Sequence, residues 1–88
     1  MNIVGKTKEG HIVVAGLGKL YFENGIPFSL IFDECQKRKL LPSWFHLRDE
    51  LKSNGMKEDR IVHLLSEQVF ESYGKEFRDV VIDRIIKK

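Results

Sequence analysis

Residues 43–73, SWFHLRDELKSNGMKEDRIVHLLSEQVFESY, decide the fold because they predict two helices joined at Gly55. Pro42 breaks the preceding segment, and the Ser43 side-chain oxygen is placed to cap the first free backbone N–H groups of a helix. Gly55 ends this helix because glycine adopts a positive φ without strain, and Met56 follows where a Schellman ending has its apolar contact. We therefore expect a helical hairpin at the centre of the fold.

The second helix of this hairpin is expected to have neighbours on two sides. Glu58 and Asp59 suit its first turn, where the helix macrodipole favours acids, and Gly74 marks its end. Its apolar residues recur at helical spacing and cover about two thirds of the helical wheel, too wide an arc for a helix lying on one surface. They are Ile61, Val62, Leu64, Leu65, Val69 and Phe70.

The first 25 residues predict a short antiparallel β-meander of two or three strands. Residues 2–5 and 11–15 suit two strands, and the loop between them ends at Gly10, as hairpin loops often do. Residues 19–22 are expected to form a third strand before a turn at residues 23–25.

Two more helices complete the expected fold. Pro27 suits the first position of a helix that runs through Lys39, and the last helix covers residues 75–87. The chain is thus expected to be a single α+β domain, residues 1–88, with the meander in residues 1–25 and four α-helices in residues 26–88. The expected core comprises Phe28, Ile31, Phe32, Ile61, Leu64, Leu65, Phe77 and Val81.

Composition narrows the classes of protein. A chain of 88 residues buries only about 60–65 % of its unfolded surface, so most apolar residues are needed for stability. The single cysteine, Cys35, permits no internal disulfide and fits a reducing compartment. No apolar run is long enough for a membrane span or a signal peptide, so we expect a cytoplasmic protein with no membrane partner. The net charge of +2 is too small to indicate a nucleic-acid partner by itself.

Three apolar residues are candidates for an interface with another protein. Ile82 and Ile86 form a second ridge about 100° from the main stripe of the last helix. This ridge either meets the N-terminal strands or contacts another chain. Trp44 lies in the first turn of its helix, where it either packs in the core or anchors a partner. The free edges of a short sheet offer a second route to association.

Basic residues cluster in two places, at Lys37, Arg38 and Lys39 and at Lys87 and Lys88. In one interpretation both clusters complement the negative ends of their helices. In the other, the fold brings them together as a site for an anionic surface or a nucleic acid. Three further lysines would extend such a site, namely Lys6, Lys8 and Lys19.

Two motifs resemble binding motifs only superficially. The sequence from Gly16 to Lys19, GLGK, lacks the third glycine of a dinucleotide site and the spacing of a Walker loop, so we expect a turn between strands. The helices around Gly55 resemble a DNA-binding helix-turn-helix. However, Glu58 and Asp59 at the start of the second helix would repel phosphate, and a structural role is expected.

No group of residues predicts catalysis. The three histidines, His11, His46 and His63, lie in different elements, and none has a metal-ligand spacing. Cys35 lies on an apolar helix stripe, where cysteine behaves as a small hydrophobe. We therefore expect no enzyme, no cofactor and no small-molecule substrate. The predicted function is that of a small protein–protein interaction module, an adaptor or inhibitor that self-associates, with a nucleic-acid-binding accessory protein as the alternative.

Overall fold

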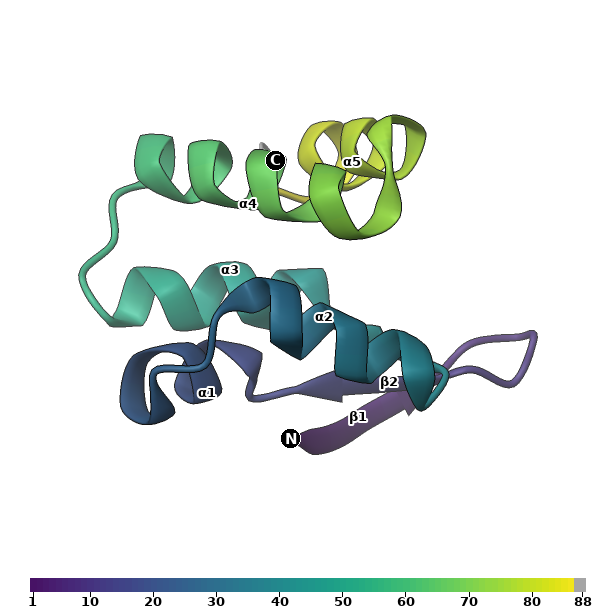
Figure 1. The fold of residues 1–88 in the computed structure, drawn as a ribbon. Helices are drawn as coiled ribbons and strands as arrows, with labels where there is room; N and C mark the ends of the chain where they lie inside the picture. Colours follow the sequence, from purple (N-terminus) through teal and green to yellow (C-terminus); the bar gives the residue numbers. More distant parts are fainter. Residues whose placement is uncertain (87–88) are drawn as a thin grey trace.

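The computed structural model describes residues 1–86 and shows a small α+β domain of three strands and five α-helices that ends in a π-helical turn, η1 (Figure 1). The elements in chain order are β1 (Asn2–Lys6), β2 (Ile12–Ala15), α1 (Leu17–Asn24), α2 (Phe28–Lys37), β3 (Leu40–Pro42), α3 (Trp44–Ser53), α4 (Glu58–Tyr73), α5 (Lys75–Val81) and η1 (Ile82–Ile86). The α+β class is confirmed, with one α-helix more than the sequence predicted.

The third strand of the meander was predicted in the wrong place. Residues 19–22 belong to helix α1, which starts after Gly16 (φ 87°) and stops at Gly25 (φ 66°). Both glycines adopt left-handed backbone angles that most other residues avoid, so they delimit a helix of two turns. The observed third strand is β3, which lies far along the chain.

The sheet has the order β1-β2-β3, with β1 antiparallel to β2 and β3 parallel to β2. A parallel pair needs a long crossover, and α1 and α2 together provide it. The predicted hairpin of β1 and β2 is confirmed. The sheet is therefore mixed, and its last strand arrives only after two helices have formed.

The helical hairpin at Gly55 is confirmed in detail. The Met56 N–H donates to the Leu51 carbonyl at 3.1 Å and the Gly55 N–H donates to the Lys52 carbonyl at 3.0 Å. These two bonds define a Schellman ending, and Met56 packs against the core. Gly55 has a φ of 89°, which explains the glycine at this position.

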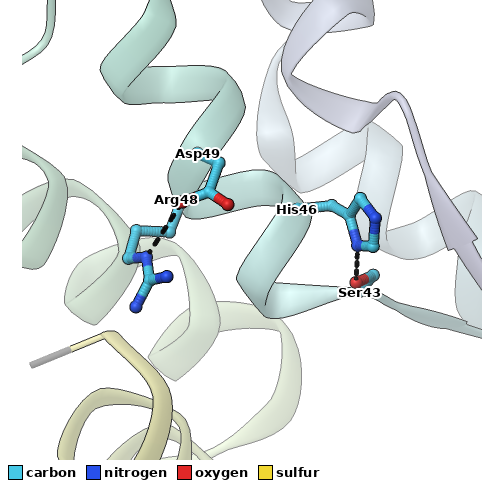
Figure 2. A network of polar contacts seen from close by, with 4 residues as sticks. All are labelled: Ser43, His46, Arg48 and Asp49. Atoms are coloured by element: carbon cyan, nitrogen blue, oxygen red, sulfur yellow. Dashed lines mark hydrogen bonds and ion pairs between the residues drawn. The ribbon is translucent and has the colours of Figure 1, made fainter. Parts of the chain in front are cut away.

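The predicted cap at Ser43 is wrong, although α3 does start there. The Ser43 hydroxyl makes no capping bond and instead contacts Nδ1 of the exposed His46, three residues on (Figure 2). The Ser43 backbone N–H continues the sheet by donating to the Val14 carbonyl at 2.8 Å. The start of α3 is thus fixed by the end of β3.

Helices α2 and α3 lie between the sheet on one side and α4 and α5 on the other (Figure 1). Side chains from every helix meet in one core, as expected for a chain of this size. Six of the eight predicted core residues are buried, Leu64 is partly buried, and Phe77 is 36 % exposed. Phe77 lies at the rim because its ring covers Tyr73 and Trp44 from outside.

The second ridge of the last helix does not face another chain. Ile82 is 6 % exposed and Ile86 is fully buried, and η1 packs against α3 and α4. The interface prediction for these two residues is therefore corrected, because their apolar surface is already covered within the chain. The alternative prediction, that this ridge meets the N-terminal strands, is also corrected, because η1 packs against α3 and α4.

Candidate functional site

Strand β1 is the most exposed regular element of the fold. All five of its residues are exposed, and they include Ile3 at 72 % and Val4 at 43 %. Its main contacts are with β2, and no helix within residues 1–86 packs against it as α2 packs against β3. One side of β1 therefore has backbone groups with no neighbouring strand.

The two edges of the sheet differ in how they are protected. β3 is three residues long, contains Pro42 with no backbone N–H, and packs against α2. Short strands, proline and a covering helix each block the pairing of an edge with another chain. β1 has five residues and no proline, and its protective features are an irregularity in the register between Ile3 and Gly5 and a lysine at its last residue. β1 is thus the less protected edge of the sheet.

The apolar surface near β1 extends onto the open face of the sheet. Val13 and Leu41 are paired neighbours in β2 and β3, and both are partly exposed. Gly5 lies opposite Val13 and has open space where a side chain would project. A strand added to β1 would extend this open face of the sheet, with β1 between it and Val13.

The fold gathers basic residues at the end of the sheet where β1 finishes. Lys6 lies opposite Ile12, and Ile12 lies opposite Leu40, so Lys39 is close to the end of β1. Lys8 lies in the loop that extends beyond this end (Figure 1). Lys37 ends α2, and Arg38 and Lys39 connect it to β3 at this same end of the sheet. These three residues, Lys6 and Lys8 therefore lie at one end of the sheet. We call these five residues the basic end.

Most cations of the basic end have no carboxylate partner. Lys37 is the exception, because its Nζ lies 3.0 Å from Asp33 Oδ2, and this contact raises the pKa of the lysine. Lys6, Lys8, Arg38 and Lys39 make no ion pair within residues 1–86. The basic end therefore has positive charge that its own acids do not neutralise.

The other predicted basic residues do not join this cluster. Lys19 lies on α1, at the opposite end of the fold in Figure 1, and pairs with Glu23 at 3.8 Å. Lys87 and Lys88 lie outside the described residues. The sequence left open whether the fold brings the basic residues together. Within residues 1–86, Lys37, Arg38 and Lys39 lie at the same end of the sheet as Lys6 and Lys8, and Lys19 does not.

Trp44 is a core residue. Its side chain is 7 % exposed, and its ring packs edge-on against the rings of Phe32, Tyr73 and Phe77. The interface role predicted for Trp44 is corrected for the same reason as that of the isoleucines: its surface is used inside the chain.

The glycine motif at Gly16 opens a helix and already holds an anion. The N–H groups of Gly16 and Gly18 donate to the two carboxylate oxygens of Glu50 in α3, both at 2.8 Å. A Cβ on Gly18 would lie 2.7 Å from the Glu50 Cβ, so only glycine allows this approach. The sequence prediction of a turn between strands missed this contact, because Glu50 lies more than 30 residues along the chain.

The titratable groups near this contact are engaged with one another. A hollow of about 400 Å³ between α1 and α3 includes Lys19, Glu23, Asp49 and Glu50 in its lining. Lys19 pairs with Glu23, Asp49 pairs with Arg48 at 3.3 Å (Figure 2), and Glu50 binds the two glycines. Each charged side chain that lines the hollow thus has a partner within the chain.

Other side chains that could react or bind a metal ion are dispersed or buried. Cys35 is buried, and loss of solvation raises its pKa, so its reactive thiolate form is disfavoured. Among residues 1–86, no three His, Cys, Asp or Glu side chains are arranged to hold a metal ion. No helix in this range has the length and apolar character to cross a bilayer.

Comparison with known proteins adds no assignment, since no family model, curated protein or solved structure matches the chain.

The sequence predicts that a short sheet has free edges, but it does not predict which edge is open, because that depends on where β3 pairs. It also gave no sign of the positive φ at Lys39.

Proposed function

We propose that this protein is a protein–protein interaction module, of the adaptor or inhibitor type, that binds an extended segment of its partner along the free edge of β1. The observation that carries the proposal is the exposure of all five residues of an edge strand, with Ile3 72 % exposed. In strand addition, backbone hydrogen bonds supply the affinity and alternate side chains supply the specificity.

The arrangement of apolar residues supports this mode of binding. Exposed apolar side chains occur singly on most proteins and need no explanation. At β1, however, Ile3 and Val4 coincide with unpaired backbone groups and with the partly exposed Val13 and Leu41. An added strand would lie beside Ile3 and Val4 and satisfy the unpaired backbone groups of β1.

The test is a selection from a random twelve-residue peptide library displayed on phage, followed by amide hydrogen exchange. Selected peptides are expected to contain alternating apolar residues and to slow the exchange of β1 amides. The variant Ile3→Asp places a charge on the edge, so it is expected to lose binding by about tenfold or more while remaining folded. Leu30→Asp is the matched control, because Leu30 is 59 % exposed but lies on α2.

Two results would count against strand addition. One is a selection that enriches no peptide. The other is a set of peptides that bind Ile3→Asp as tightly as the unchanged protein and leave the exchange of β1 amides as it was.

A further inference from the structure

We propose that the partner is an extended peptide with two parts. An apolar part pairs with β1 as an added strand, and an acidic part next to it lies at the basic end. Such a partner presupposes strand addition to β1, the function proposed above. The new element is the chemistry of the ligand and the direction in which it lies.

The position of the cations relative to the edge supports an acidic ligand. Lys6 is the last residue of β1, and Lys39 precedes the strand that lies two places across the sheet. Neighbouring strands are about 4.8 Å apart, so a strand added to the free edge of β1 would lie next to Lys6, with β3 about 14 Å away across the sheet. Lys6 is therefore the cation nearest the added strand, and Lys39 acts on it at longer range. A peptide on the edge would therefore pass the basic end as it leaves β1.

The backbone of Lys39 gives a second, independent indication. Lys39 has a φ of 56°, and it is the only residue other than glycine with a positive φ within residues 1–86. Its position just after α2 is one where helices commonly end in glycine. A lysine in this conformation is strained, and strained residues concentrate at functional sites. The lysine side chain thus appears where glycine would serve the fold better, and its charge is the property that glycine lacks.

Two other occupants fit these features less well. A second copy pairing through its own β1 would bring the sequence NIVGK, which has no carboxylate to offer Lys6. A nucleic acid would neutralise the cations, but its phosphates cannot continue the regular backbone pairing of the sheet. An acidic peptide satisfies both the unpaired strand and the unpaired cations.

The direction of the peptide follows from the sheet. Antiparallel pairing is the slightly more stable arrangement, and a peptide antiparallel to β1 has its earlier residues beside Lys6. The acidic residues are therefore expected to precede the apolar strand in the partner sequence.

The test uses two synthetic peptides with the same strand of alternating Val and Thr. One begins with four Glu residues and the other with four Lys residues. The acidic peptide is expected to bind at least about tenfold more tightly, since several exposed ion pairs each add a modest gain, and to slow the exchange of β1 amides. The difference is expected to shrink at high salt.

Variants of the basic end locate the charge effect. Lys6→Gln removes the cation nearest the added strand, so it is expected to bind the acidic peptide about two- to fivefold less tightly. Lys39→Gly and Lys39→Asn both tolerate the positive φ, and each is expected to fold and to lose less affinity than Lys6→Gln, because Lys39 lies farther from the edge. Lys52→Gln is the matched control, because Lys52 is an exposed lysine at the far end of α3 (Figure 1). It is expected to leave the affinity unchanged.

The possible failures are distinguishable. Equal binding of both peptides with protected β1 amides would overturn the acidic partner and leave strand addition intact. Failure of both peptides to slow β1 exchange would contradict strand addition itself. Tighter binding of a 20-nucleotide single-stranded DNA, lost in Lys39→Gly, would overturn the peptide in favour of a nucleic acid. A dimer in light scattering with protected β1 amides would overturn it in favour of a second copy.

Discussion

Lys39 has a φ of 56°, in the region where glycine is stable and a residue with a Cβ atom is strained. Lys39→Gly is therefore expected to raise the free energy of unfolding by about 1 kcal/mol. Urea denaturation followed by circular dichroism measures this difference. Lys37→Gly is the control: it is the last residue of α2 and has no positive φ for glycine to relieve, so this variant is expected not to gain stability. A destabilised Lys39→Gly would show that the lysine side chain supports the fold instead.

Tyr73 has a buried hydroxyl with no hydrogen-bond partner among the described residues. Its ring stacks on Phe77, so the site retains its packing when the oxygen is removed. Because a buried polar group without a partner costs free energy, Tyr73→Phe is expected to stabilise the protein by about 1 kcal/mol at neutral pH. A loss of stability in thermal or urea unfolding would mean that the hydroxyl has a partner in solution.

The same hydroxyl makes stability depend on alkaline pH. Burial, with a smaller contribution from Cys35, raises the pKa of Tyr73 above its ordinary value. The unfolded chain releases this proton above a pH of about 10, while the folded chain keeps it. The free energy of unfolding should therefore fall as pH rises, by up to about 1.4 kcal/mol per pH unit from this group. Tyr73→Phe should show a shallower fall, and equal slopes would contradict the assignment.

At the scale of elements, α1 is held to α3 by the Glu50 carboxylate and two glycine N–H groups. Glu50→Ala leaves both donors unpaired in a partly buried place, so it is expected to lower the free energy of unfolding by about 2 kcal/mol. Glu71→Ala is the control, because Glu71 is an exposed acid of α4 that makes no ion pair within residues 1–86. Equal stabilities of the two variants would show that α1 does not need this contact.

The elements also show which features the sequence could predict. The Schellman ending at Gly55 was predicted because its signals lie within a few residues of each other. The prediction of the third strand failed because β3 pairs with β2 across more than 25 positions of the sequence. In addition, β3 has only three residues, too few to show the alternation typical of a strand. Residues 19–22 looked like a strand, whereas Gly16 and Gly25 fix them as a helix through backbone angles that sequence alone does not reveal.

For the candidate site, the sequence identified one basic cluster, but it did not identify Ile3 and Val4 or the open edge of β1. Lys37, Arg38 and Lys39 were identified as a basic cluster, but only the fold places them beside Lys6. The apolar ridge of Ile82 and Ile86 was recognised, yet it packs against α3 and α4. An apolar stripe on a helix shows that a contact exists, and does not show whether the partner is the same chain.

At the scale of the whole molecule, the burial of Ile86 determines how much its substitution changes the stability of the fold. Ile86→Asp places a charge in the core, so it is expected to lower the free energy of unfolding by at least about 4 kcal/mol. This is a large part of the stability of a small domain, and the variant should be largely unfolded by circular dichroism. Val80→Asp is the control, since Val80 is 49 % exposed and its loss should cost little. A folded Ile86→Asp monomer would show that the ridge serves another chain.

The central claim is that β1 is an open edge that accepts an acidic strand. The most direct measurement is an NMR experiment that records nuclear Overhauser contacts between the isotope-labelled protein and the peptide with four leading Glu residues. We predict cross-strand contacts between the peptide backbone and Ile3 to Lys6, with the Glu residues nearest Lys6. Contacts with any other element, and none with β1, would contradict it.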